Sequence, residues 1–174
     1  MARPQDHPLS SREILDEVTR AHNSRDVVDV EEETVKVVVF TLGQRRYAFP
    51  GQDIKEILPD CQVYPVPSLP GYLPGLINVR GEIESAVDLR PFLGGTPSGP
   101  GRVMMAMAQR GDFRAGIIIE AVEDVTDLPK SRIKPALATL TGPARDLAAG
   151  EVDLGEGQTA TLIDLEKLAA MVTL

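Results

Sequence analysis

The chain has 174 residues, a net charge of −8 and a single cysteine. This length suits one domain or two small fused domains. One cysteine excludes an intramolecular disulfide, and we expect Cys61 to be a small buried hydrophobe in a protein of a reducing compartment. The sequence has no cluster of Lys and Arg to neutralise phosphates, which argues against nucleic acid and anionic membranes as partners.

The start of the sequence shows no targeting signal. Residues 1–8 lack the basic start and apolar run of a signal peptide. Every apolar stretch is far shorter than the roughly 20 residues that a membrane span needs. We therefore expect a cytoplasmic protein without direct membrane insertion.

Residues 1–33 are predicted to form a helical and acidic arm. Ser10 to Glu13 is a capping-box pattern, and Ile14, Val18 and Ala21 then follow at helical spacing, which predicts a helix over 11–22. Residues 23–33 are polar and acidic and are typical of a linker. The helix is a docking element, a loosely attached arm or a helix packed on its own domain.

From Thr34 the pattern changes to short strands. Residues 35–42 are rich in β-branched and aromatic side chains and predict a strand, Gly43 begins a turn, and residues 47–49 return. Residues 53–58 predict a turn or a bent strand, and five prolines between Pro59 and Pro74 exclude a long helix there. Residues 75–80 and 82–87 predict two more strands joined at Gly81.

A second half repeats this plan after a Gly- and Pro-rich loop, residues 94–101. Strands are predicted at 102–107 and 113–119, and Ala86 to Leu89 recurs 76 residues later as Leu162 to Leu165. Asp88 and Asp164 are then suited to cap the helical segments that follow. The repeat predicts two small antiparallel barrels, residues 34–93 and 102–174, sharing an apolar seam lined by the strand of Met104, Met105 and Met107.

The sequence is poor in groups that perform chemistry. Its two histidines, His7 and His22, lie in the arm, and the barrels offer one thiol, so we predict no enzyme, no metal site and no cofactor. Asp53, Glu56 and Asp60 could pair as carboxylates, as could Glu82 and Glu84, but such side chains near strand ends are usually solvated. The sequence therefore favours a protein that works by contact.

Arg80 is a lone cation at the end of a predicted strand, and two interpretations of it stay open. A guanidinium can form a bidentate pair with a carboxylate of the same chain, with Asp88 or Glu56 as candidates. It can equally anchor an acidic group of a partner, because Arg is enriched at interface hot spots.

Several motifs in this order resemble the CheW-like chemotaxis coupling proteins. They cover residues 35–171: Val39 to Gly43, Tyr47 to Phe49, Ile54 to Ile57, Val66-Pro67, Gly75 to Gly81, Val87 to Arg90, and the closing Leu162 to Leu168. The resemblance implies a mainly β fold of two pseudo-repeated five-stranded SH3-like barrels. It also implies a non-enzymatic adaptor between chemoreceptor tips and the regulatory domain of a CheA-type histidine kinase, which has the same fold. Such an adaptor could be recruited to membrane receptor arrays.

The resemblance also suggests which residues bind. Ile54, Glu56, Gly75 and Arg80 match family positions at or beside the receptor contact. We expect the kinase to contact exposed apolar strand ends around Val63, Tyr64 and Val66. With Ile57 and Val79, these residues form the predicted set of receptor- or kinase-binding positions.

The sequence departs from the family pattern in places. Glu84-Ser85 stands where an apolar residue and proline are usual, Glu120 replaces a usual aspartate, and the acidic arm is long. These departures motivate an alternative, an adaptor of a divergent chemosensory two-component pathway that controls motility or development. A further alternative of another class is a small-barrel hydrolase that uses Asp53, Glu56 or Asp60.

Overall fold

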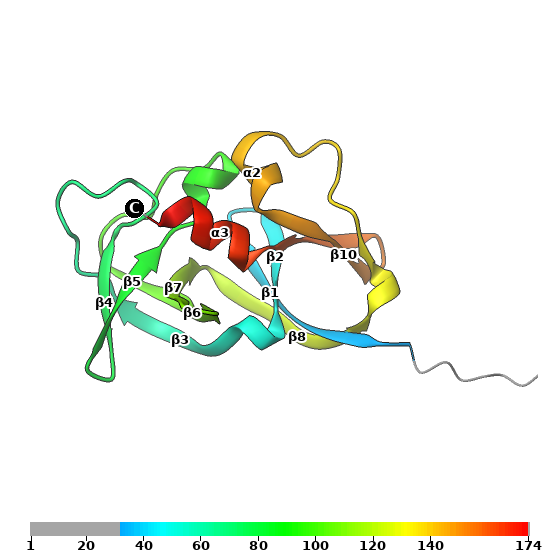
Figure 1. Cartoon of the computed structure of the whole chain (residues 1–174), viewed down its shortest axis with the longest axis horizontal. Helices are drawn as coiled ribbons and strands as arrows, with labels where there is room; N and C mark the ends of the chain where they lie inside the picture. Colours follow the sequence, from blue (N-terminus) through cyan, green and yellow to red (C-terminus); the bar gives the residue numbers. More distant parts are fainter. Residues whose placement is uncertain (1–31, 174) are drawn as a thin grey trace, which may run out of the picture. The chain divides into compact units, whose positions relative to one another are not determined.

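The computed structural model describes residues 32–173, and from Glu33 onward they form one compact unit. The helix expected over residues 11–22, and all but the last two residues of the linker expected after it, lie outside the described residues. The unit consists of two curled sheets (Figure 1). The mainly β fold class expected from the sequence is confirmed.

The first sheet has six strands in the order β8-β1-β2-β11-β10-β9. Its strands are β1 (Thr34–Leu42), β2 (Arg45–Pro50), β8 (Ala121–Pro129), β9 (Ile133–Lys134), β10 (Ala148–Gly155) and β11 (Gln158–Ile163). The second sheet has five strands in the order β3-β6-β7-β5-β4. These are β3 (Ile54–Gln62), β4 (Gly75–Val79), β5 (Glu82–Val87), β6 (Arg102–Arg110) and β7 (Phe113–Ile119).

Five short helical segments join or cover the strands. They are η1 (Gly51–Asp53), η2 (Arg90–Leu93), η3 (Lys130–Arg132), α2 (Gly142–Leu147) and α3 (Leu165–Val172). In Figure 1, η2, α2 and α3 gather on one side, while β3 and β8 run along the opposite side. Residues 53–58, expected as a turn or bent strand, are the end of η1 and the start of β3, whose pairing with β6 is interrupted by two register shifts.

The sheets do not follow the two halves of the sequence, so the expected barrel bounds of 34–93 and 102–174 need correction. The β1–β2 hairpin joins β8 to β11, whereas β6 and β7 join the strands of the first half. Each sheet therefore exchanges a hairpin with the other half. Side-chain patterns locate strands, but they do not say which strands pair across a long sequence separation.

The internal repeat is nevertheless real at the level of the backbone. The turn at Gly43-Gln44 between β1 and β2 corresponds to the turn at Gly111-Asp112 between β6 and β7, 68 residues later. Each of these hairpins also pairs in parallel with a strand of another hairpin. In the first sheet Ala48 of β2 lies beside Leu162 of β11, and in the second sheet Gly116 of β7 lies beside Ala86 of β5. The turns that precede β5 and β11 lie 76 residues apart.

A shared core lies between the sheets. Phe40 and Phe49 of the first sheet stack with ring centroids 4.4 Å apart, and they belong to one cluster with Ile117 of the second sheet and with Leu165 and Leu168 of α3. All five are at most 1% exposed. Burying such side chains contributes roughly 1.5–3 kcal/mol each, which gives the two small sheets the core that neither has alone.

The β6 strand lines this seam, but the methionines expected there divide between two cores. Ala106 joins the shared cluster and Met104 packs against it, whereas Met105 and Met107 are buried in a separate core of the second sheet. The reason is the alternation of side chains along a strand. Cys61 lies in the same separate core at 7% exposure, as expected, and burial raises the pKa of its thiol.

Candidate docking surface

Arg80 lies in the two-residue turn between β4 and β5. Its φ of 52° and the φ of 91° at Gly81 are both positive, as a type I′ hairpin turn requires. Asn78 Oδ1 accepts the Gly81 N–H at 2.8 Å, which holds the turn. Val79, by contrast, is 5% exposed and packs inside the sheet, so this predicted binding residue supports the turn from within.

Arg80 forms a bidentate pair with Glu56 across the second sheet. Its two terminal nitrogens donate to the Glu56 carboxylate at 3.0 and 2.7 Å. The Arg80 side chain is still 77% exposed, against 28% for Glu56. The structure therefore contains the ion pair within the chain that was one of the two interpretations of Arg80. The exposed guanidinium also stays accessible to a partner, as the other interpretation requires.

Ile54 and Ile57 flank Glu56 on β3, a strand at the edge of the second sheet. Both are half-buried and pack against the shared core, so each combines a structural contact with a partly accessible surface. Together with the Arg80–Glu56 pair they form what we call the β3 surface.

Gly75 has a structural role that a larger residue could not fill. Its φ is +155°, and a Cβ atom built there would lie 2.0 Å from the carbonyl oxygen of Tyr64. The close approach allows the backbone pairing of Tyr64 with Leu76, whose two N–H···O bonds measure 2.8 and 2.9 Å. Gly75 is buried, so it positions the surface without itself being accessible.

The strand ends predicted to contact the kinase are only partly exposed. Tyr64 is 58% and Val66 37% exposed, but Val63 is 2% exposed and is buried in the core of the second sheet. The expectation of an exposed Val63 is therefore wrong, because alternate residues of an extended segment face opposite sides.

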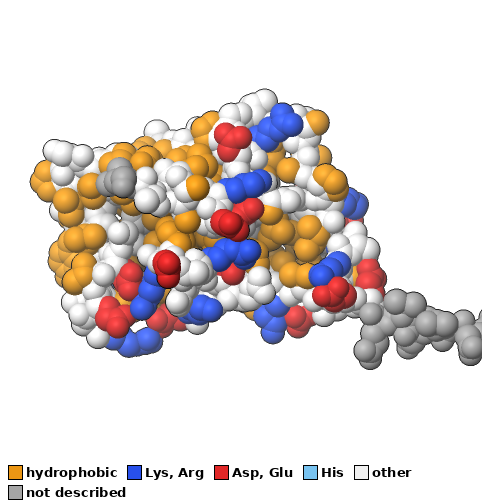
Figure 2. All heavy atoms as spheres, in the orientation of Figure 1, with side chains coloured by type: hydrophobic (Ala, Val, Ile, Leu, Met, Phe, Trp, Pro, Cys, Tyr) orange, Lys and Arg blue, Asp and Glu red, His pale blue; other side chains and the backbone are white. Residues whose placement is uncertain are grey.

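Two exposed apolar residues near Tyr64 were not predicted from the sequence. They are Leu76, which is 37% exposed, and Ile83, which is 62% exposed. The pairings of β4 with β5 and of Leu76 with Tyr64 put the side chains of Tyr64, Leu76 and Ile83 on one face. The signal was present in the alternation of β4, where Gly75, Ile77 and Val79 face inward. We call Tyr64, Val66, Leu76 and Ile83 the Tyr64 patch. Figure 2 shows hydrophobic side chains gathered over this end of the second sheet.

The carboxylates of η1 and β3 do not converge on a common point. Glu56 pairs with Arg80, Asp53 pairs with Arg110 at 3.0 Å, and Asp60 pairs with Arg102 at 2.6 Å. The hydrogen bond from Arg102 holds the pKa of Asp60 below its ordinary value. Because each carboxylate is held by a different arginine, the arrangement gives the hydrolase interpretation no support.

Other acidic groups are likewise committed. Glu82 and Glu84 both contact Arg114, at 2.9 Å each. Within residues 32–173, no group of three or more His, Cys, Asp or Glu side chains is placed to hold a metal ion. In the same part of the chain, no helix has the length and apolar character needed to cross a membrane.

The two aspartates expected to cap helices differ. Asp164 is the N-cap of α3 and accepts the N–H groups of Glu166 and Lys167. The N-cap of η2 is Leu89, so the expectation for Asp88 needs correction. Asp88 is completely buried and accepts hydrogen bonds from Arg90 and from the Ser98 N–H instead. A buried carboxylate requires such partners, and here the loop after η2 supplies one.

Comparison with known proteins identifies the fold and the family. A family model described as CheW-like domain matches residues 36–172. Chemotaxis protein CheW of Klebsiella aerogenes is 31% identical over 132 residues, covering 75% of this chain and 79% of that protein. Protein FrzA of Myxococcus xanthus is 26% identical, covering 74% of this chain and 81% of that protein.

A solved structure supports the fold independently. The crystal structure of the scaffolding protein TtCheW from Thermoanaerobacter tengcongensis superposes with a TM-score of 0.67 at 24% identity. It covers 76% of this chain and 90% of that one. At this identity the likeness shows a common fold, here the pair of curled sheets.

Proposed function

Because the chain belongs to the CheW-like family, we propose that it is a non-enzymatic adaptor that couples chemoreceptors to a CheA-type histidine kinase. The observation that carries this proposal is the second sheet, which bears both the β3 surface and the Tyr64 patch. An adaptor needs two accessible surfaces, one for each partner.

The β3 surface is assigned to the tip of the chemoreceptor. Its half-buried isoleucines offer apolar area, and the exposed Arg80 guanidinium offers hydrogen-bond donors beside it. Arg is a frequent interface anchor because its planar group can pair and stack at the same time. Glu56 holds that group in a fixed position before a partner arrives.

The Tyr64 patch is assigned to the regulatory domain of the kinase. A tyrosine beside aliphatic side chains is the composition typical of the centre of a protein interface. If the kinase domain has the same double-barrel fold, the contact joins two sheet ends, and a modest interface of about 1,200–1,600 Å² is expected.

Two substitutions separate the assignments. Leu76→Ser should weaken binding to the kinase regulatory domain by about tenfold, because a centrally buried apolar contact is worth roughly 1.4 kcal/mol or more. Arg80→Ala should leave that binding nearly intact and weaken binding to a receptor tip. Calorimetry with each purified partner measures both constants.

Val125→Ser is the matched control, since Val125 is an exposed apolar residue of β8 in the first sheet, outside the Tyr64 patch. If Leu76→Ser binds the kinase domain as tightly as the unaltered protein does, the assignment of the Tyr64 patch is wrong. Failure of the unaltered protein to bind any CheA-type regulatory domain or receptor tip would contradict the adaptor function itself.

A divergent chemosensory pathway, controlling motility or development, is the second candidate. The likeness to Protein FrzA, a relative that carries a different name from the CheW proteins, supports it, as does the long acidic segment before β1. Deletion of residues 1–33 should then abolish binding to the partner of that pathway while the remaining chain stays folded. Unchanged affinity after the deletion would remove this candidate.

A further inference from the structure

A cavity of about 610 Å³ lies between the tip of the β1–β2 hairpin and the loop that follows η2. This volume is within the usual range for a small-molecule site. Leu42, Leu93, Pro97 and the ring of Tyr47 give it apolar walls, and Arg45 and Arg90 also line it. None of the residues that line the cavity belongs to the β3 surface or to the Tyr64 patch.

A charged network fixes both walls of the cavity. Arg90 donates to the buried Asp88 at 3.2 Å, to Ser98 Oγ at 3.0 Å and to Glu120 at 3.0 Å. Glu120 in turn accepts the Gly43 N–H of the hairpin tip at 2.9 Å. The hairpin and the loop are therefore held in place without a ligand, which lowers the conformational cost of binding one.

The lining of the cavity carries positive charge. It contains two arginines and no carboxylate, in a chain whose net charge is −8. Arg90 is neutralised by Asp88 and Glu120. Arg45 is exposed and, within residues 32–173, makes no ion pair with a carboxylate. One guanidinium is thus left to bind an anion.

A neutral hydrogen-bond donor stands beside Arg45. Tyr47 is 5% exposed, and its hydroxyl lies within reach of the Arg45 side chain. Burial raises the pKa of Tyr47, so the hydroxyl keeps its proton near neutral pH. It can therefore donate to an anion that Arg45 attracts.

The corresponding cavity of the other hairpin provides a comparison within the same molecule. It lies at the tip of β6–β7 beside α3, has a volume of about 620 Å³ and contains Asp112. Its arginines, Arg110 and Arg114, are paired with Asp53 and Glu84. Phe113 occupies the position that Arg45 has in the first cavity. The unpaired cation is thus specific to the β1–β2 cavity.

We propose that the cavity beside Arg45 and Tyr47 binds a small organic carboxylate with an apolar body. Arg45 binds the carboxylate with its forked N–H groups, and the Tyr47 hydroxyl donates a further hydrogen bond. The apolar body packs against Leu42, Leu93 and Pro97. Arg90 is a positioning residue, because its own hydrogen bonds are already committed to the walls.

Benzoate is a suitable probe, and benzamide is its uncharged counterpart of similar shape. Calorimetric titration of the full chain should show benzoate binding and no benzamide binding. Arg45→Gln should weaken benzoate binding by about tenfold or more, because a charge-assisted hydrogen bond is worth about 1.5–3 kcal/mol. Tyr47→Phe should weaken it about threefold to tenfold, because a neutral hydrogen bond is worth about 0.5–1.5 kcal/mol.

Arg46→Gln is the matched control, since Arg46 is the adjacent arginine and pairs with Glu123 outside the cavity. It should bind benzoate like the unaltered protein, and melting curves should show all three variants folded. Equal binding of benzoate and benzamide, or equal losses in Arg45→Gln and Arg46→Gln, would overturn the proposal. So would binding of a blocked glutamyl peptide in place of benzoate, because the source of the carboxylate would then be a partner protein.

Discussion

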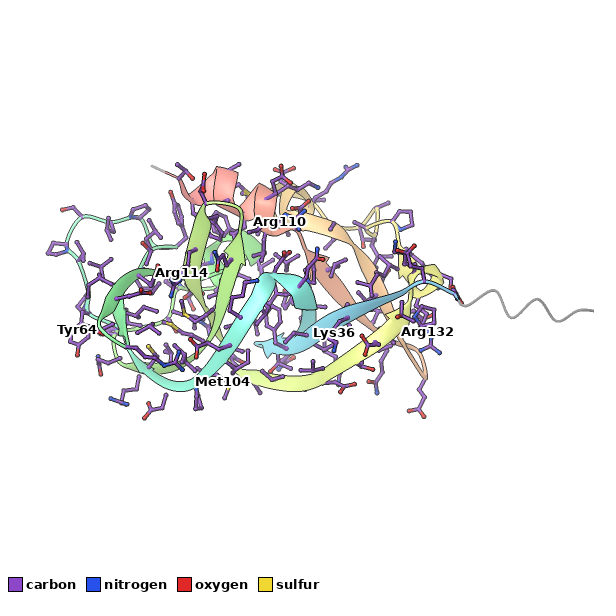
Figure 3. The ribbon with its side chains drawn as sticks, turned by 60° about the horizontal axis from the view of Figure 1, so that its bottom comes forward. Lys36, Tyr64, Met104, Arg110, Arg114 and Arg132 are labelled. Carbon is purple, nitrogen blue, oxygen red and sulfur yellow. The ribbon has the colours of Figure 1, made fainter. Side chains whose placement is uncertain are left out.

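The two sheets have the same backbone plan but present different chemistry to solvent. In the second sheet Tyr64 pairs with Leu76, and in the first sheet the corresponding pair is Lys134 with Glu151. The turn that holds Arg80 in one sheet holds Glu156 in the other, and both residues have a φ of 52°. Figure 3 places Tyr64 and Arg132 of η3 toward opposite ends of the described unit.

This difference shows what the fold requires and what it leaves free. A close approach of two backbones, a two-residue turn and a buried seam occur in both sheets, so the fold requires them. The outward side chains are not constrained in this way, and at the matched positions they are apolar in the second sheet, Tyr64 with Leu76, and charged in the first, Lys134 with Glu151. Exposed apolar residues concentrated on one of two equivalent surfaces indicate a binding role for that surface.

The largest expected effect comes from the glycines at the two backbone approaches. Gly75→Ala should destabilise the protein by about 3 kcal/mol or more, because it combines a disfavoured φ with a clash against the Tyr64 carbonyl. In Gly150→Ala the added Cβ would lie 2.6 Å from the Lys134 carbonyl oxygen, without a positive φ, so a loss of about 1–3 kcal/mol is expected.

Urea unfolding of the two variants measures this difference. The comparison between the sheets would be wrong in this respect if Gly150→Ala were the more damaging substitution.

Asp88 and Asp164, which are 76 residues apart, should also differ in how much their loss destabilises the protein. Asp88→Ala leaves Arg90 without its buried partner and should cost about 3 kcal/mol or more. Asp164→Ala removes an exposed N-cap and should cost about 1 kcal/mol. Chemical unfolding of both variants tests the order, and equal losses would mean that burial at Asp88 adds nothing.

The link between the sheets through Glu120 should depend on pH. The Gly43 N–H and Arg90 hold the pKa of Glu120 below its ordinary value of 4.5. A carboxyl whose folded-state pKa is depressed adds stability above its unfolded-state pKa, and that contribution is lost as the pH falls through the folded-state pKa. Glu120→Gln should therefore lose stability relative to the unaltered protein at pH 6 and much less at pH 3.

Unfolding free energies at the two pH values provide the measurement. A difference between the two proteins that is the same at pH 6 and pH 3 would contradict the role of the Glu120 charge.

The smallest effect on stability is expected at the most exposed member of the β3 surface. Arg80→Ala removes a surface ion pair and should change the stability by less than about 1 kcal/mol. Its melting temperature should stay nearly unchanged while binding to a receptor tip weakens. If the variant unfolds instead, the pair with Glu56 is structural and Arg80 is not a binding anchor.

The sequence predicts local features of this fold well and long-range ones poorly. Gly43, Gly81 and Gly111 mark hairpin turns because a turn depends on a few adjacent residues, and all three lie in turns. The exchange of hairpins between halves was not predictable, because strand pairing depends on contacts between distant residues. Val63 was expected to be exposed but faces the core, whereas Leu76 and Ile83 face solvent and were not predicted to do so. In each case the face of the extended segment that is turned to the core was not recognised from the sequence.

The exchange of hairpins has a consequence for how the chain reaches its native state during synthesis. The β1–β2 hairpin leaves the ribosome early, yet its partner strands, β8 and β11, begin only at Ala121 and Gln158. Two of the six strands of the first sheet must therefore wait with unpaired edges, and such long-range pairing slows folding and favours aggregation. Cleavage within residues 94–101 should leave two fragments that remain associated, since each supplies strands that the other lacks.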